Sequence, residues 1–270
     1  MTSISPLGCQ PPTRLNECCS LQKYSFISEQ TPPPSLMREG GKFIIEMWDN
    51  NILANCTSCG IADGLSYFVS LGYFTLPITT ADVNAFYSLS TGYSPNIPGS
   101  DLGGEPTHVL EILQDKGYKL QYPGKKDYSY TFPAVFGVID YSSRKSIANG
   151  IYSLGFVYGA FALTLMDQKR VYEDEVWDDD MLLELENGKN DLPWSWGGHV
   201  MIIIGYTGLG DCDFVTLVTW GRKYKATWRW VEKRLVALYG VSFPELFNTH
   251  GFNPAGLNTQ EVNEFLHIGK

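Results

Sequence analysis

Residues 49–68 have the sequence DNNILANCTSCGIADGLSYF, the pattern of a loop that leads into a helix. Small and amide residues come first, and apolar residues then recur at helical spacing. Cys56 therefore lies at or near the first turn of a predicted helix, where unpaired backbone N–H groups and the helix dipole favour a thiolate. Alternatively, Cys56 and Cys59 are small buried hydrophobic side chains. The stretch makes a candidate nucleophile.

A histidine far downstream supports the nucleophile interpretation. His199 follows two glycines and begins an apolar segment that ends at Tyr206, and a later segment ends in Val218-Thr219-Trp220-Gly221. This order resembles the papain-like cysteine peptidases, in which a cysteine opens a long helix and a Gly-Gly-His histidine follows about 130 to 150 residues later. In that family an Asn-Ser-Trp-Gly segment comes next. Here the separation is 199 − 56 = 143 residues.

The composition indicates a globular protein. The chain has 270 residues, of which 44% are hydrophobic and 18% are charged, and its net charge of −9 argues against a nucleic-acid partner. No apolar stretch approaches the roughly 20 residues that span a bilayer. Residues 1–14 lack the charged start and apolar core of a signal peptide. We therefore predict a non-secretory location, intracellular or in a virion, with all six cysteines reduced.

Three segments are expected along the chain. Residues 1–34 are Pro-rich without periodicity, and we predict a tail that wraps the domain or stays mobile. An inhibitory propeptide is the functional alternative, although the resemblance implies a longer, helical prosegment. Residues 35–242 form the predicted peptidase domain and residues 243–270 a C-terminal helical extension. The acidic run 173–180 is expected to be a solvated loop.

The resemblance implies an α+β fold of two lobes, a helical lobe that carries Cys56 and an antiparallel, barrel-like sheet lobe that carries His199. Hydrophobic periodicity and the positions of proline and glycine predict the individual elements. The predicted helices are 56–71, a helix opened by Pro106 and ended by Gly117, and 142–154; the predicted strands are 132–140, 155–161, and a meander of 199–206, 214–220 and 226–231.

Two cysteines compete for the role of nucleophile. If Cys59 is chosen, the run Cys-Thr-Ser-Cys is similar to the family's Cys-Gly-Ser-Cys, but the residue six positions earlier is Leu53, which cannot donate a hydrogen bond. If Cys56 is chosen, Asn50 falls on the family glutamine whose amide donates to the oxyanion. We favour Cys56, with Asn50 as the oxyanion donor.

The substrate-binding residues are also assigned by resemblance. Gly103-Gly104 lies in a Gly-Gly-x-Pro run like that of the family, where glycine lets a substrate backbone pair with the enzyme. Gly198, directly before His199, and Trp220, in the later Trp-Gly pair, are assigned to the substrate site by the same resemblance. The implied reaction is hydrolysis of a peptide or protein substrate through a Cys-His acyl-enzyme. It needs no cofactor, and the spacing of the remaining histidines does not suggest a metal site.

Three departures from the family pattern put activity in question. Asn50 is shorter than glutamine, Thr57 replaces a tryptophan, and Val218 replaces the asparagine that orients the histidine. The missing acceptor predicts reduced activity unless a backbone carbonyl, a water or Asp213 takes its place. The alternatives are a non-catalytic papain-like protein that binds peptides or serves a larger assembly such as a virion, and a transglutaminase or acyltransferase with the same Cys-His chemistry.

Overall fold

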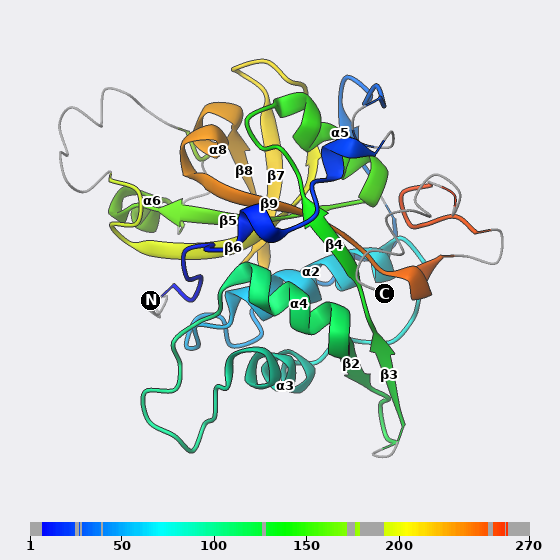
Figure 1. Ribbon diagram of the computed structural model, residues 1–270, viewed down its shortest axis with the longest axis vertical. Helices are drawn as coiled ribbons and strands as arrows, with labels where there is room; N and C mark the ends of the chain where they lie inside the picture. Colours follow the sequence, from blue (N-terminus) through cyan, green and yellow to red (C-terminus); the bar gives the residue numbers. More distant parts are fainter. Residues whose placement is uncertain are drawn as a thin grey trace.

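The computed structural model describes residues 7–24, 27, 29–38, 40–125, 128–171, 176–178, 192–247, 251–256 and 258. A helical lobe lies against one side of an antiparallel sheet (Figure 1). The helices are α2 (Cys56–Ser70), α3 (Thr80–Thr91), α4 (Pro106–Lys116), α5 (Arg144–Leu154), α6 (Leu165–Arg170) and α8 (Trp228–Arg234), with 3-10 turns at Leu15–Glu17, Leu21–Lys23 and Pro244–Leu246.

The sheet has the strand order β4-β9-β5-β6-β7-β8, and β1 pairs with β6 at one end. All its neighbouring strands are antiparallel. The strands are β1 (Leu36–Met37), β4 (Val135–Val138), β5 (Val157–Leu163), β6 (Gly197–Tyr206), β7 (Phe214–Thr219), β8 (Arg222–Thr227) and β9 (Leu235–Ser242). A separate hairpin pairs β2 (Tyr118–Gln121) with β3 (Ser129–Phe132).

Strand β6 is buried on both faces, which explains its unbroken apolar sequence. Val200 and Ile202 belong to the core on the α2 side, whereas Met201 and Ile203 belong to a second core on the opposite side. This alternation follows from the two-residue period of a strand. The central strand that carries His199 is thus held from both sides.

Helix α2 packs tightly on the sheet through two glycines. A Cβ atom added at Gly60 would lie 2.8 Å from Val200 Cγ1, and one added at Gly64 would lie 2.3 Å from Phe156. Because there is no room for a larger side chain, the helix axis lies close to the strands. The packing fixes the first residue of α2, Cys56, beside the start of β6.

The α+β fold of a helical lobe and an antiparallel sheet lobe is confirmed. The helices that begin at Cys56 and Pro106, and the first two strands of the predicted meander, match their predictions closely. The sheet order runs openly from β4 to β8, so these strands do not close a barrel.

One predicted strand is wrong, and several elements were not predicted, among them α3 and β9. Residues 226–231 mostly form α8, because the Thr227 side chain caps this helix by accepting from the Trp230 N–H at 3.3 Å. Helix α3 begins with a capping box of Thr79 and Asp82 inside a Ser/Thr-rich stretch. Strand β9 directly follows α8 and pairs with β4 and β5.

The predictions for the N-terminal tail and the C-terminal extension can be compared with the structure only in part. Residues 7–24 are described and pack on the domain, whereas residues 259–270 of the expected C-terminal extension lie outside the described residues. Of the acidic run, residues 176–178 are described, and Trp177 is fully buried rather than solvated. The boundaries at residues 34 and 242 stay predictions.

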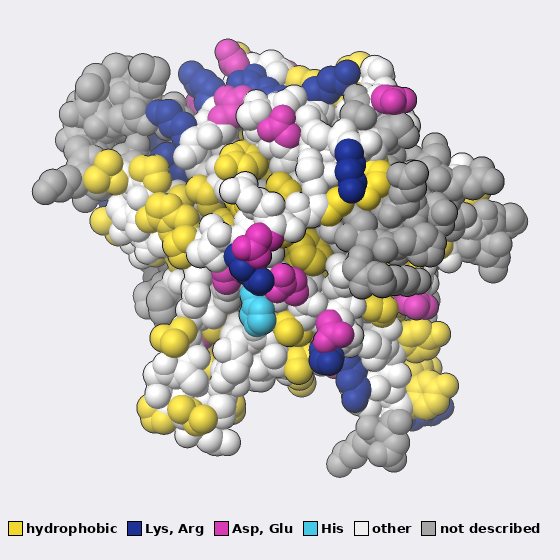
Figure 2. Space-filling view, viewed as in Figure 1, with side chains coloured by type: hydrophobic (Ala, Val, Ile, Leu, Met, Phe, Trp, Pro, Cys, Tyr) yellow, Lys and Arg dark blue, Asp and Glu magenta, His cyan; other side chains and the backbone are white. Residues whose placement is uncertain are grey.

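The surface mixes both signs of charge. Acidic and basic side chains adjoin one another on the face shown in Figure 2. Within the described ranges, no helix combines the length and the hydrophobicity needed to cross a membrane.

Candidate active site

Cys56 is the first residue of α2 and is fully buried. Asn55 precedes it at the N-cap, and the backbone carbonyl of Asn55 accepts hydrogen bonds from the N–H groups of Ser58 and Cys59 at 2.9 and 3.0 Å. Burial raises the pKa of the Cys56 thiol to about 11, against the opposing effect of the backbone N–H groups of Val200 and Gly8. Desolvation therefore outweighs the helix dipole, and the thiol is neutral in this conformation.

An amide network shapes the loop before Cys56. Asn50 Nδ2 donates to Asn55 Oδ1 at 3.0 Å, and Asn55 Nδ2 donates to the Trp48 carbonyl at 2.8 Å. Trp48 and Asp49 have positive φ values of 42° and 63°, a conformation that is costly for residues other than glycine. Asn50 thus braces a strained loop, and its role as oxyanion donor stays a prediction.

Cys59 belongs to this amide network. Its Sγ donates to Asn55 Oδ1 at 3.2 Å, and its side chain is 5% exposed. Burial and then the nearby Asp63 raise the pKa of the Cys59 thiol well above its ordinary value. This environment suits a structural thiol better than a nucleophile.

His199 is buried and held on two sides. Its Nε2 lies 2.6 Å from Thr219 Oγ1, and its ring stacks on Trp220 with centroids 3.9 Å apart and an interplanar angle of 16°. Nδ1 has no hydrogen-bond partner among the described residues. Burial lowers the pKa of His199 to about 3, so the imidazole is neutral and free of an ion pair with Cys56 in this conformation.

The residue after Val218, Thr219, provides a hydrogen-bonding group for the histidine in place of the missing asparagine. Val218 is fully buried in the core on the α2 side, whereas the next residue, Thr219, reaches the imidazole. Adjacent residues of a strand point to opposite faces, so the orienting group has moved by one position. Asp213 does not take this role, because its carboxylate accepts the Gly210 N–H at 2.8 Å in the β6–β7 turn.

The N-terminal segment of the chain passes through the site. Cys9 N donates to the Gly198 carbonyl at 3.0 Å, and Gln10 N donates to the Gly104 carbonyl at 3.0 Å. Gly104 N in turn donates to the Gly8 carbonyl at 2.7 Å. Cys9 thereby bridges two of the predicted substrate-binding glycines, in parallel with Gly104 and antiparallel with Gly198.

At three glycines, the space around this segment leaves no room for a side chain. A Cβ atom added at Gly8 would lie 1.8 Å from the Ala54 carbonyl oxygen, and one at Gly103 would lie 1.9 Å from the Gly8 oxygen. At Gly198 an added Cβ would lie 2.2 Å from the Cys9 oxygen. We call this space, bordered by Ala54, Gly103, Gly104 and Gly198, the peptide groove. The segment that fills it, residues 7–10, is called the plug.

Contacts farther along the tail anchor the plug. Arg14 pairs with Glu111 of α4, and Ser20 forms a parallel bridge with Val138 of β4. Leu21 is fully buried in the core on the far side of the sheet. The described tail thus wraps the domain, the first of the two expected arrangements. Sequence reasoning missed the plug because pairing through backbone atoms leaves little trace in side-chain patterns.

The structure brings most of the predicted site residues together. Cys56, Gly104 and Gly198 all contact or adjoin the plug, and the N–H of Val200, the residue after His199, is directed at the Cys56 sulfur. Trp220 supports the histidine ring rather than the plug. No cluster of three or more His, Cys, Asp or Glu side chains in the described part of the chain could hold a metal ion.

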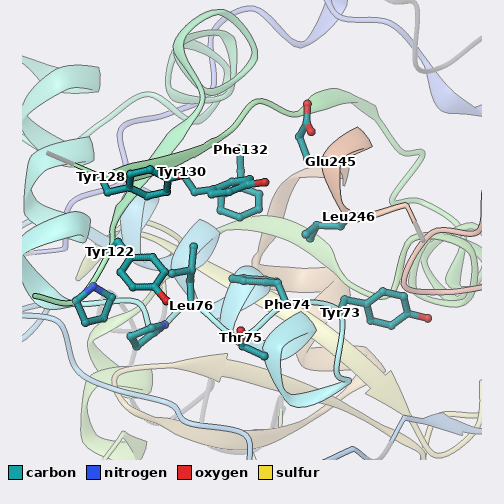
Figure 3. A pocket seen from close by; sticks show the side chains of 12 residues that line it. Tyr73, Phe74, Thr75, Leu76, Tyr122, Tyr128, Tyr130, Phe132, Glu245 and Leu246 are labelled. Atoms are coloured by element: carbon teal, nitrogen blue, oxygen red, sulfur yellow. The ribbon is translucent and has the colours of Figure 1, made fainter. Parts of the chain in front are cut away.

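An open hollow of the surface lies elsewhere. It has a volume of about 580 Å³ and is formed mainly by aromatic side chains of the β2–β3 hairpin and of residues 73–77 (Figure 3). Tyr130 and Glu245 are among its lining residues, whereas Cys56 and His199 are not. We call it the tyrosine groove.

Comparisons with known proteins show the fold. A scan against protein-family models finds no match, and a search of curated proteins finds no similar sequence. Xylellain, a cysteine protease from Xylella fastidiosa, is 11% identical with a TM-score of 0.62, over 90% of this chain and 97% of that chain. Procathepsin L2 from the Tenebrio molitor larval midgut is 12% identical with a TM-score of 0.56, over 90% and 79%. ProCathepsin B S9 from Trypanosoma congolense is 12% identical with a TM-score of 0.54, over 88% and 86%. The chain thus has a papain-like fold.

Proposed function

We propose that this protein is a cysteine-type peptidase that hydrolyses peptide bonds with Cys56 and His199, and that the plug holds it in a latent state. The observation that carries the proposal is the plug itself. A polypeptide backbone lies extended in the peptide groove, hydrogen-bonded to Gly104 and Gly198 and adjoining the sulfur of Cys56. A groove that binds one peptide backbone beside a buried thiol is suited to bind another.

The proposed reaction begins when the plug leaves. With Nε2–H donating to Thr219, His199 Nδ1 accepts the Cys56 thiol proton and the sulfur bonds to the scissile carbonyl carbon. The Cys56 N–H and the Asn50 amide stabilise the negative oxygen. His199 then protonates the departing amine as the C–N bond breaks. Water hydrolyses the thioester, which releases the carboxylic acid and restores the thiol.

The plug is a poor substrate because of how it lies. The Gly8 N–H, not a carbonyl carbon, is directed at the Cys56 sulfur. The Gly8 carbonyl is instead bonded to Gly104 N at 2.7 Å, away from the proposed oxyanion donors. The protonated thiol is also the less reactive form of the sulfur. The plug is therefore bound without being cleaved.

One observation favours a second candidate, a papain-like protein that binds peptides without turnover. His199 Nδ1 has no hydrogen-bond partner among the described residues, so Cys56 and His199 are not engaged with each other in this conformation. A groove that only binds peptides needs no such engagement. The predicted intracellular or virion location and the association with a larger assembly stay predictions under either candidate.

The test is labelling by a peptidyl epoxide together with cleavage of a peptide library. In full-length, reduced protein with Gly8→Val, which displaces the plug, we expect cleavage and a label on Cys56 by mass spectrometry. Cys56→Ala should abolish both, whereas the matched variant Cys59→Ala should retain both. A label on Cys59 would contradict the chosen nucleophile. Binding of the library without cleavage or labelling would favour the second candidate.

A further inference from the structure

One carboxylate joins the two sides of the peptide groove. Asp101 lies between α3 and α4, and its two oxygens accept the Ala54 N–H, each at 3.1 Å. Asp101 Oδ1 also accepts the hydroxyl of Tyr87 at 2.5 Å. Ala54 is two residues before Cys56, so Asp101 directly holds the loop that leads into Cys56. We call this loop, residues 48–55, the nucleophile loop.

Tyr87 adds a second hydrogen-bonded link, to Gly103 of the peptide groove. Its hydroxyl accepts the Gly103 N–H at 3.1 Å while it donates to Asp101. The side chain is fully buried on α3, and burial and then the Asp101 carboxylate raise the pKa of the phenol. Tyr87 therefore stays protonated, and both hydrogen bonds keep their direction.

These bonds hold Ala54 and Gly103, two residues that border the peptide groove beside Gly8. Ala54 and Gly103 lie on opposite sides of Gly8, and added Cβ atoms at Gly8 and Gly103 would meet backbone oxygens at 1.8 and 1.9 Å. A backbone that fits with no room to spare needs walls whose separation does not drift. Asp101 is itself two residues before Gly103, so its bonds to Ala54 and Tyr87, together with the bond from Gly103 to Tyr87, tie the Gly103–Gly104 segment to Ala54.

We propose that Asp101 and Tyr87 are positioning residues of the peptide groove: they hold the nucleophile loop and the Gly103–Gly104 segment at the separation that an extended peptide backbone requires. For the plug, this inference rests only on the observed contacts. For substrates, it rests on the proposed peptidase function.

The test compares two tyrosines whose rings lie against each other. Tyr87 and Tyr93 have ring centroids 5.0 Å apart, but Tyr93 stands outside the Asp101 chain of hydrogen bonds. Tyr87→Phe removes the shared hydroxyl, whereas Tyr93→Phe is the matched control. In the full-length chain, amide hydrogen exchange at Gly103 and Gly104 should speed up roughly 10-fold in Tyr87→Phe and stay unchanged in Tyr93→Phe. Exchange at Ile202, in the core of β6, should not change in either.

A second pair of variants covers the case in which Tyr87→Phe does not fold. Asp101→Asn keeps a carbonyl oxygen for the Ala54 N–H and the Tyr87 hydroxyl, whereas Asp101→Ala keeps none. We expect exchange at Gly103 to remain near the parent rate in Asp101→Asn and to rise in Asp101→Ala. Equal behaviour of these two variants, or of Tyr87→Phe and Tyr93→Phe, would overturn the proposal.

A kinetic readout separates positioning from chemistry. In the Gly8→Val chain, Tyr87→Phe should raise the inhibition constant of a peptidyl epoxide roughly 10-fold with little change in the limiting rate of inactivation. A fall in the limiting rate with an unchanged inhibition constant would contradict a positioning role. Hydrogen exchange needs no catalysis, so a chain in which Cys56 never reacts would end the peptidase proposal without deciding this one.

Discussion

The peptide groove and the tyrosine groove differ in both openness and chemistry. The tyrosine groove is open, with a volume of about 580 Å³, but its lining holds no nucleophile and no histidine. The peptide groove has the thiol, the imidazole and the paired glycines, but the chain's own backbone fills it. Since an occupied site does not appear as a cavity, a search for open hollows would miss the peptide groove.

The comparison also shows how occupancy changes chemistry. Burial raises the pKa of Cys56 to about 11 and lowers that of His199 to about 3, so both groups are held in their neutral forms. The same two groups in contact with water would lie nearer their ordinary values. The latent state is therefore one of low thiol reactivity as well as blocked access.

The largest expected effect separates the two grooves by function. In the Gly8→Val chain, His199→Ala should lower the rate of peptide cleavage by roughly 10²- to 10⁴-fold, because the general base is lost. His108→Ala is the control, since His108 is exposed on α4 beside Glu111. The measurement is the initial rate with a fluorogenic peptide. A rate in His199→Ala equal to that in His108→Ala would remove the histidine from the site.

A second effect concerns stability against pH. The pKa of His199 is depressed from 6.5 to about 3, so the unfolded chain binds a proton at pH values where the folded chain does not. Stability is therefore fully present above about pH 6.5 and is lost as the pH falls toward 3. His199→Gln should remove a few kcal/mol of this pH dependence, measured by urea unfolding between pH 7 and pH 4. Identical slopes in parent and variant would contradict a buried neutral histidine.

A smaller effect tests how the histidine is oriented. Thr219→Val keeps the shape of the side chain but removes the hydroxyl that lies 2.6 Å from His199 Nε2. The loss of this hydrogen bond should cost roughly 1 to 3 kcal/mol, about 5- to 150-fold in the limiting rate of inactivation by a peptidyl epoxide. Thr219→Ser should restore most of the rate. A normal rate in Thr219→Val would mean that another group orients the ring.

The smallest effect is expected in the tyrosine groove. Tyr130 lines this groove, and its side chain is 52% exposed. Tyr130→Ala should leave both the epoxide inhibition constant and the limiting rate of the Gly8→Val chain unchanged. A marked rise in the inhibition constant would show that substrates extend from the peptide groove into the tyrosine groove.

Much of the fold could be predicted from the sequence because its strongest signals are local. The helix from Cys56 has apolar periodicity, and α4 has a proline in its first turn and Gly117 after its end. Helix α8 could not be distinguished from a strand because its apolar run is short and the apolar residues in that run are all buried. Helix α3 was missed because polar residues dominate its sequence.

The site could be predicted only as far as its side chains. Cys56, His199 and the glycines were chosen from motifs, but Val218 was expected to leave His199 without its usual partner, and the Thr219 hydroxyl one residue later, which lies beside the imidazole, was not considered. The plug depends on backbone hydrogen bonds between residues that lie nearly 200 positions apart in the sequence, as with Cys9 and Gly198. Neither composition nor periodicity reports such pairing.

The central claim is that Cys56 is a nucleophile masked by the chain's own N-terminal segment, and alkylation by iodoacetamide tests it most directly. Cys212 is exposed and serves as an internal control. We predict that Gly8→Val increases the alkylation rate of Cys56 on the order of 100-fold, because the three backbone hydrogen bonds of the plug are lost. The rate at Cys212 should not change.

A matched variant is Gly41→Val, since a Cβ atom at Gly41 would make only an ordinary contact with the Ser70 oxygen at 3.5 Å. Mass spectrometry of each cysteine peptide gives the rates. A Cys56 that stays as slow in Gly8→Val as in Gly41→Val, in folded and reduced protein, would contradict the masked nucleophile.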